Sequence, residues 1–113
     1  MKIYRATEKD LEEVVSWIDT KESCRIWGGP SVSYPIRLKD LIEEISFSVD
    51  TSYVYKVKEE VVGFGQVIKK AKGSNHLARI ITSPGSRGKG YGFDLCNGLI
   101  SIAKESGSII TLN

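Results

Sequence analysis

The stretch that decides the fold is residues 80–92, IITSPGSRGKGYG. Its order of residue types predicts a β-strand, a turn at Pro84, a glycine-rich loop and the start of a helix. Pro84 ends the strand because proline has no N–H to donate to a neighbouring strand. Gly88, Gly90 and Gly92 alternate along the loop, and a residue without a Cβ lets the backbone approach a ligand closely. The sequence therefore predicts a binding loop between a strand and a helix.

A helix is expected directly after this loop. Its apolar residues recur at intervals of three and four and would share one face; they are Phe93, Cys96, Leu99, Ile100 and Ala103. Lys104 in the last turn and Gly107 just beyond it are typical of a helix end. The N–H groups and dipole at a helix N-terminus attract anions, and Arg87 and Lys89 add positive charge. The pattern predicts a phosphate or pyrophosphate ligand.

Two common phosphate-binding motifs do not fit. Gly85 and Gly90 have the glycine spacing of the Walker loop, but Tyr91 stands where that motif requires lysine. The dinucleotide motif also fails, because no third glycine follows at the required distance.

The run 87–92, RGKGYG, matches the pattern Arg/Gln-x-x-Gly-x-Gly/Ala. It resembles the acyl-coenzyme A loop of the GNAT-type N-acetyltransferases. In that family an apolar-x-Pro sequence commonly precedes the arginine, and Thr82 to Pro84 occupies that place. The opening residues 3–7, followed by acids, also resemble the start of many members. The alternative is a glycine-rich turn that binds nothing.

The resemblance spans the chain and implies a fold of the α+β class in three layers. The sheet would be mixed and mainly antiparallel, with helices on both faces and the order β-α-α-β-β-β-α-β. Residues 1–113 would form a single GNAT-like domain that lacks the family's last helix and strands. The open edge of the last strand would then favour a homodimer joined near residues 108–113.

The expected elements can be placed on the chain. Residues 3–6 form a strand, Thr7 caps a helix, residues 20–36 are irregular, and residues 37–48 form a second helix. Residues 53–57 and 61–68 form a hairpin, residues 76–82 the central strand and residues 108–113 the last strand. Gly63 and Gly65 share one face of their strand, which predicts close packing or a bulge.

The resemblance also implies acetyl-coenzyme A as co-substrate and acetyl transfer to an amine of a small molecule or protein. The residues expected to bind the coenzyme are Ile80, Ile81, Thr82, Arg87, Gly88, Lys89, Gly90, Tyr91 and Gly92. A backbone N–H near Ile81 or Thr82 is the candidate donor to the developing oxyanion. Trp27 and Tyr34 lie in the segment that helps bind the acceptor in this family; hydrophobic cover is the simpler interpretation of both.

No acid or base is assigned. The strand 76–82 contains no Asp or Glu, and His76 lies at its far end from the loop. Glu59 and Glu60 are expected in a solvated hairpin turn. A non-catalytic acyl-coenzyme A binding or interaction module of the same fold therefore remains the alternative to an enzyme.

Composition is that of an ordinary globular domain, with 113 residues, 41% hydrophobic and 27% charged. The net charge is only +2, but residues 61–93 contain six Lys and Arg residues and no acid. This predicts a basic surface that attracts a polyanion such as coenzyme A. Nucleic acid is a weaker interpretation, because only Phe64, Tyr91 and Phe93 are aromatic in this stretch, and proteins that bind single strands need aromatic side chains on which the bases stack.

Two cysteines, Cys24 and Cys96, predict neither a disulfide framework nor a metal site. Cys96 is expected to be a small core residue. The residues after Met1 run directly into charged sequence, with no signal for secretion and no apolar span. These features predict a cytoplasmic protein with reduced thiols.

Overall fold

The computed structural model describes residues 3–70, 74–106 and 109–112. The elements follow the order β1 (Ile3–Arg5), α1 (Glu8–Val15), α2 (Lys21–Gly28), α3 (Leu38–Glu44), β2 (Ser52–Val57), β3 (Glu60–Lys69), β4 (Ser74–Thr82), a 3-10 turn (Pro84–Ser86), α4 (Tyr91–Ser106) and β5 (Ile109–Leu112). Pro84 follows the end of β4, as predicted. Within the described ranges, no helix combines the length and apolar character that crossing a bilayer requires.

The strands form one sheet with the order β1-β2-β3-β4-β5. The first four strands pair antiparallel, and β5 lies parallel to β4, with Ser74 opposite Ile109 and Leu77 opposite Leu112. The mixed, mainly antiparallel sheet is therefore confirmed. The prediction that residues 76–82 form the central strand was wrong: β3 holds the middle of the sheet, and β4 lies between β3 and β5.

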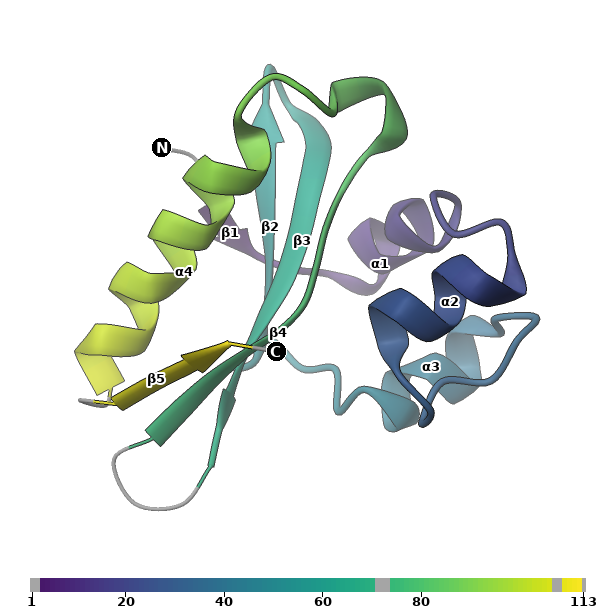
Figure 1. Cartoon of the computed structure of the whole chain (residues 1–113), viewed down its shortest axis with the longest axis horizontal. Coiled ribbons are helices and arrows are strands. Elements are labelled where there is room, and N and C mark those ends of the chain that lie inside the picture. Colours follow the sequence, from purple (N-terminus) through teal and green to yellow (C-terminus); the bar gives the residue numbers. More distant parts are fainter. Residues whose placement is uncertain (1–2, 71–73, 107–108, 113) are drawn as a thin grey trace.

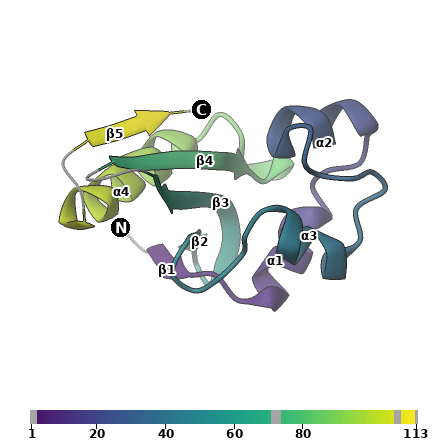
Figure 2. The ribbon, with the colours of Figure 1, turned by 90° about the horizontal axis from the view of Figure 1, so that it is seen from below.

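Helices cover both faces of the sheet, as predicted. Helix α4 lies on one side, whereas α1, α2 and α3 gather on the other (Figures 1 and 2). The buried apolar residues accordingly form two clusters. One joins α1, α2 and α3 to β2 and β3 through residues such as Leu11, Trp27, Leu41 and Phe64. The other joins α4 to the opposite face through Leu95, Leu99 and Leu77.

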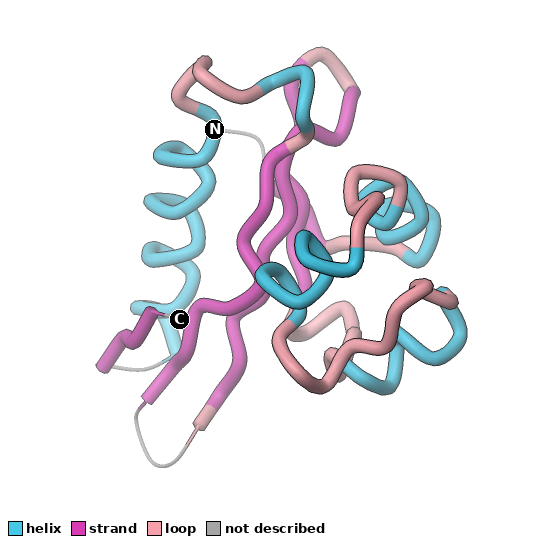
Figure 3. Tube along the Cα trace, turned by 45° about the vertical axis from the view of Figure 1, so that its right-hand side comes forward, coloured by secondary structure: helices cyan, strands magenta, loops and turns pink. Residues whose placement is uncertain are grey.

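The long helix α4 runs along one side of the strands (Figure 3). It sits close to the sheet because β3 presents glycine beneath it. A Cβ added at Gly65 would lie 2.6 Å from Leu99 Cδ1, and one at Gly63 would lie 3.0 Å from Leu95 Cδ2. The β3–β4 register also shifts between Phe64 and Gln66. The close packing predicted for the two glycines is confirmed, and the register shift beside Gly65 places its extra residue on β4.

The predicted apolar face of α4 was partly wrong. Phe93 is 73% exposed, and the fully buried stripe is Leu95, Leu99 and Ala103, at intervals of four. Cys96 is only half-buried. The spacing of apolar residues in α4 is compatible with either stripe. The stripe with Leu95 and Leu99 is buried because these leucines fill the space that Gly63 and Gly65 leave on β3.

The irregular segment predicted at residues 20–36 was also wrong in its first half, where α2 adds a helix to the predicted order. Thr20 and Ser23 form reciprocal caps: the Ser23 N–H donates to Thr20 Oγ1 at 3.0 Å, and the Thr20 N–H donates to Ser23 Oγ at 3.2 Å. Gly29, with φ +77°, follows the helix. The glycines and proline at residues 28–30 masked this helix because they stop it after only two turns.

Helix α3 is shorter than the predicted range 37–48. It ends at Glu44, and Ser46 takes a positive φ of 52°.

Candidate active site

A cleft of about 590 Å³ opens along the edge of β4. It is lined by residues of the segment between α1 and α2, of α2, of β4, of the loop after β4 and of α4: Trp17, Ile18, Ser23, Ile26, Trp27, Leu77, Arg79, Ile80, Ile81, Arg87 and Cys96. The described part of β5 pairs with Ser74–Leu77, and β4 continues beyond the end of that pairing (Figure 1). The backbone edge of the second half of β4 therefore borders the cleft.

The glycine-rich loop joins this edge to α4. Gly88 and Gly90 have φ values of +86° and +79°, in the region that side chains disfavour. A Cβ at either position would meet no atom within 4 Å. Backbone conformation, and not crowding within the protein, is thus the reason for glycine at these positions.

The loop delivers free donors at the start of α4. The first intrahelical bond runs from the Asp94 N–H to the Gly90 carbonyl at 3.1 Å. The N–H groups of the preceding turn have no partner within the helix, as at any helix N-terminus. Together with the helix dipole they favour an anion at this point.

Arg87 and Lys89 are exposed at the same loop. The Arg87 Nη2 group donates to the carbonyl of Thr82 at 3.4 Å, which ties the loop to the end of β4. The hydroxyl of Ser83 also donates to that of Ser86 at 2.7 Å. The strand, the loop and the cleft are thereby held in one arrangement.

Tyr91 anchors the first turn of α4 to the sheet. Its ring meets the ring of Tyr55 edge-on, with centroids 5.8 Å apart. The Tyr55 hydroxyl donates to Asp94 Oδ2 at 3.3 Å. Burial raises the pKa of the Tyr55 phenol, and the Asp94 carboxylate raises it further, so the phenol keeps its proton and remains a donor.

The backbone of β4 exposes alternate N–H groups to the cleft. The Ser83 N–H donates to the Val62 carbonyl at 2.9 Å, across to β3. Hydrogen bonds alternate along an antiparallel pair, so Ile81, two residues earlier, also faces β3. Thr82 faces the opposite way, which agrees with its carbonyl accepting from Arg87. By the same alternation, Ile80 and Thr82 direct their N–H groups away from β3.

A bulge at Arg79 changes the course of β4. Phe64 pairs with Ile81 and Gln66 with Ala78, so β4 has one more residue than β3 over this interval. Arg79 has φ +53°. Its Nη1 group donates to Gln66 Oε1 at 2.9 Å, and its carbonyl accepts from the indole N–H of Trp27 at 2.9 Å. Sequence reasoning did not identify Arg79 as a site residue, because neither an arginine nor the residues beside it indicate a positive φ.

The two predicted acceptor-side residues occupy different hollows. Trp27 is 7% exposed, packs at a tilt on Phe64 and borders the cleft. Tyr34 borders a second hollow on the outer side of α2, and its hydroxyl donates to the Asp19 carbonyl at 3.0 Å. Trp27 therefore combines hydrophobic cover with a position at the cleft, and Tyr34 does not share that cleft.

Comparison with known proteins assigns a family to this arrangement. A model of the acetyltransferase (GNAT) family matches residues 11–113. The chain belongs to the GNAT acetyltransferase family. The predicted resemblance is confirmed, and membership is consistent with acetyl-coenzyme A as co-substrate.

Solved structures resemble the fold of this GNAT chain. A transcriptional regulator from Bacillus halodurans C-125 has 25% identity and a TM-score of 0.72, over 99% of this chain and 80% of that one. A Mycobacterium tuberculosis protein in complex with CoA and NLQ has 18% identity and a TM-score of 0.66, over 93% of this chain and 58% of that one. N-acetylglutamate synthase from Neisseria gonorrhoeae, complexed with coenzyme A and N-acetyl-glutamate, has 17% identity and a TM-score of 0.68, over 94% of this chain and 23% of that one. The GNAT chain thus spans less than two thirds of both coenzyme-bound proteins.

The cleft of the GNAT chain is poor in proton-transfer groups. Its described lining includes no Asp, Glu or His, and burial raises the pKa of the Cys96 thiol. His76 borders a different hollow of about 270 Å³, beside Lys70 and Ile45. Among the described residues, no group of three or more His, Cys, Asp or Glu is arranged to hold a metal ion.

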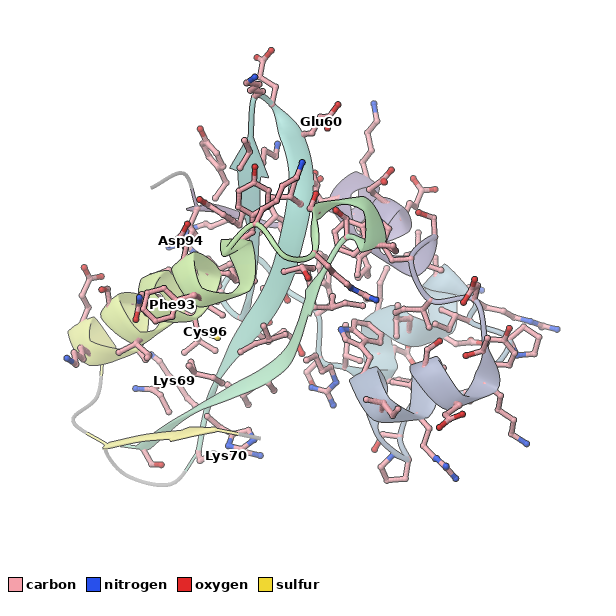
Figure 4. All side chains as sticks on the ribbon, turned by 45° about the horizontal axis from the view of Figure 1, so that its top comes forward. Glu60, Lys69, Lys70, Phe93, Asp94 and Cys96 are labelled. Atoms are coloured by element: carbon pink, nitrogen blue, oxygen red, sulfur yellow. The ribbon has the colours of Figure 1, made fainter. Side chains whose placement is uncertain are left out.

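The basic stretch 61–93 does not form one surface, contrary to the prediction. Lys69 and Lys70 lie at the end of β3, away from the first turn of α4 that carries Asp94 (Figure 4). The length of β4 separates these lysines from Arg87, about 25 Å at the usual rise of a strand. Arg79 is half-buried between the two ends, and Lys72 lies outside the described residues. Of the described cations in this stretch, Arg87 and Lys89 are the two that lie in the loop.

Proposed function

We propose that this protein is an N-acetyltransferase that transfers an acetyl group from acetyl-coenzyme A to an amine of a small molecule or protein. The observation that carries the proposal is the loop at residues 87–92, where two left-handed glycines and two cations lead from the cleft edge of β4 into α4. Residues 1–113 would act as a single acetyltransferase domain.

The coenzyme would lie along the loop and the edge of β4. N–H groups of Gly88–Gly92, with Arg87 and Lys89, would bind the pyrophosphate, because backbone donors and charge converge there. The exposed edge at Ile80–Thr82 would pair with the amides of the pantetheine arm as an added strand does. Tyr91 would support this site by holding the first turn of α4 against Tyr55.

The reaction is attack by a neutral amine on the thioester carbonyl carbon. The amine nitrogen forms the new C–N bond, the C–S bond breaks, the amine loses a proton and the coenzyme thiolate takes one up. Of the two donor candidates in the sequence, the strand alternation favours the N–H of Thr82 over that of Ile81, and it adds Ile80. Alignment of the reactants and a preorganised donor for the oxyanion supply the rate enhancement.

The acceptor would enter from the side of α2. Ser23, Ile26 and Trp27 line the cleft there, so an amine that reaches the thioester passes an indole and an exposed aliphatic side chain. Tyr34 would contribute only to the approach, from the neighbouring hollow.

Calorimetric titration with acetyl-coenzyme A tests the binding half of the proposal. We expect saturable binding that weakens at least tenfold in Arg87→Ala, because that side chain supplies charge to the pyrophosphate and a bond to Thr82. Arg25→Ala, on the outer hollow of α2, is the matched control and should bind as the wild type does. Absence of saturable binding to the wild type would refute the function.

A thiol-release assay over a panel of amines tests the catalytic half. Release that depends on the amine supports the transferase. Binding of the coenzyme without release from any amine would favour the non-catalytic acyl-coenzyme A module instead.

The same proposal places the protein in the cytoplasm, where its two free cysteines would stay reduced. It also includes a homodimer formed through the edge of β5, the last strand in the described sheet order.

A further inference from the structure

The bulge of β4 places a residue of unusual backbone conformation at the cleft. Arg79 has φ +53° although it carries a long side chain. Such conformations are unfavourable for any residue except glycine, and they persist where surrounding contacts hold them. The contacts of Arg79 are therefore the interactions that stabilise the bulge.

Two anchors hold the bulge. On the backbone side, the indole N–H of Trp27 donates to the Arg79 carbonyl at 2.9 Å, across 52 residues of sequence. On the side-chain side, Arg79 Nη1 donates to Gln66 Oε1 at 2.9 Å. Gln66 is itself fixed, because its Nε2 donates to the Ile45 carbonyl at 2.9 Å and to Ser52 Oγ at 3.1 Å. Gln66 and Ser52 are fully buried, so this anchor belongs to the core.

The Trp27 bond fixes a whole peptide group. In a trans peptide the C=O of one residue and the N–H of the next point in opposite directions. Because the Arg79 carbonyl points at α2, the Ile80 N–H points away from α2, towards the side of the cleft lined by Leu77 and Cys96. The alternation of β4 adds that this N–H also points away from β3, since Ile81 faces β3.

We propose that Trp27 is a positioning residue that, with Gln66 acting through Arg79, holds the Ile80 N–H as a donor to the thioester carbonyl oxygen of acetyl-coenzyme A. The inference rests on the proposed function. It gives Trp27 a role that does not require contact with the acceptor: the indole acts through the 79–80 peptide. A donor fixed before the substrate arrives needs no reorganisation when the oxyanion forms.

The test observes the carbonyl and needs no acceptor. Acetyl-coenzyme A labelled with ¹³C at the carbonyl is bound to the protein, and its isotope-edited infrared band is compared with that in solution. A fixed hydrogen bond gives a narrowed band at lower frequency. We expect this shift in the wild type and its loss in Trp27→Phe, which keeps the ring in the core but removes the N–H.

A second readout is the preference for acetyl-coenzyme A over S-ethyl-coenzyme A, which has a group of similar size without the carbonyl oxygen. One hydrogen bond corresponds to a preference of about two- to tenfold. We expect this preference in the wild type and a ratio near one in Trp27→Phe, with the affinity for coenzyme A itself unchanged within about twofold.

Trp17→Phe is the matched control. Trp17 also lines the cleft, but its indole N–H donates to Glu13 Oε2 at 3.2 Å and does not touch the bulge. This variant should keep both the infrared shift and the preference. A merely structural role for indoles in the cleft would affect the two variants alike.

The outcomes separate the inference from the function. If the wild type binds no coenzyme A, the proposed function fails. If it binds and Trp27→Phe retains both the shift and the preference, the positioning role is overturned. Should Trp27→Phe not fold, Gln66→Met decides, since it removes the other anchor: loss of the shift supports the proposal, and retention overturns it.

Discussion

Gly88 and Gly90 show how single residues shape the candidate site. Their positive φ values turn the chain from the strand into α4, and a side chain at either position would meet strain before it met a neighbour. Of the three alternating glycines, Gly88 and Gly90 are therefore required by the backbone conformation of the loop. Gly92, which lies inside the helix, has no such requirement.

Replacement of Gly90 by valine should weaken coenzyme binding. A β-branched residue at φ +79° is disfavoured by about 1–2 kcal/mol, and the loop would relax away from the geometry that aims its N–H groups. We expect at least a tenfold rise in the Kd for acetyl-coenzyme A, measured by calorimetry. Gly85→Val is the control, because that glycine has open space around it and a φ outside the left-handed region. Equal affinities of the two variants would contradict the assignment of the loop.

Cys96 provides a chemical probe of the cleft. Burial raises the pKa of its thiol above the ordinary value of 9.0, so little thiolate is present at neutral pH. Alkylation by iodoacetamide should therefore be slow at pH 7 and rise about tenfold per pH unit up to the pKa. Saturating coenzyme A should slow it further, since Cys96 lines the cleft.

Peptide mass spectrometry can follow both cysteines in one sample. Cys24 is the internal control: the pKa of its thiol is also raised, chiefly by burial, but it borders the outer hollow of α2. Coenzyme A should leave its rate unchanged. Protection of Cys24 and not of Cys96 would place the coenzyme elsewhere.

At the scale of elements, the fold depends on how closely α4 approaches β3. Gly65 and Leu99 face each other where α4 covers the sheet, and the same helix begins at the glycine loop. The position at which α4 packs on the sheet therefore determines where the glycine loop lies relative to the cleft. Stability and site geometry are coupled through this contact.

Gly65→Ala should destabilise the protein by about 1–3 kcal/mol, because its Cβ would lie 2.6 Å from Leu99 Cδ1 and the helix would have to shift. Denaturant unfolding measures the loss. In a Leu99→Ala background the added methyl has room, so the further change should be near zero or stabilising. Additive effects of the two substitutions would show that the contact is not the cause.

Sequence reasoning was most successful for elements with strong local signals. Thr7 caps α1 as predicted, and a reciprocal bond with Asp10 completes the cap. Pro84 follows β4, and the glycines of β3 lie under α4. It missed α2, whose capping pair Thr20 and Ser23 is a weaker form of the usual Ser/Thr-x-x-Glu pattern. It also placed the apolar stripe of α4 only in part, with Leu99 and Ala103 buried but Phe93 exposed, because periodicity does not tell which of two apolar faces meets a sheet.

At the scale of the molecule, two helical layers enclose one sheet, and the candidate site lies where those layers approach the same stretch of β4. The loop and α4 come from one side, and Trp27 comes from the other. A local motif can predict the first contribution. The second comes from a residue 52 positions earlier in the chain, and only the fold brings it there.

The open edge of β5 predicts self-association at this scale. Strand pairing across two copies would satisfy the backbone groups at that edge. Size-exclusion chromatography with light scattering should give twice the chain mass, and the mass should fall towards that of a monomer on dilution. A single-chain mass at the highest concentration would contradict the dimer without affecting the assignment of the coenzyme loop.

The amino-acid sequence alone determined the strand, proline, glycine loop and helix, and with them the family, because these depend on local backbone chemistry. It also left the general base unassigned, since the strand 76–82 offers no acidic side chain. The tertiary structure decided that β4 carries a bulge at Arg79, that Trp27 and Gln66 hold it, and which N–H groups face the cleft. Those features arise from contacts between distant segments, and no local pattern of residues specifies such contacts.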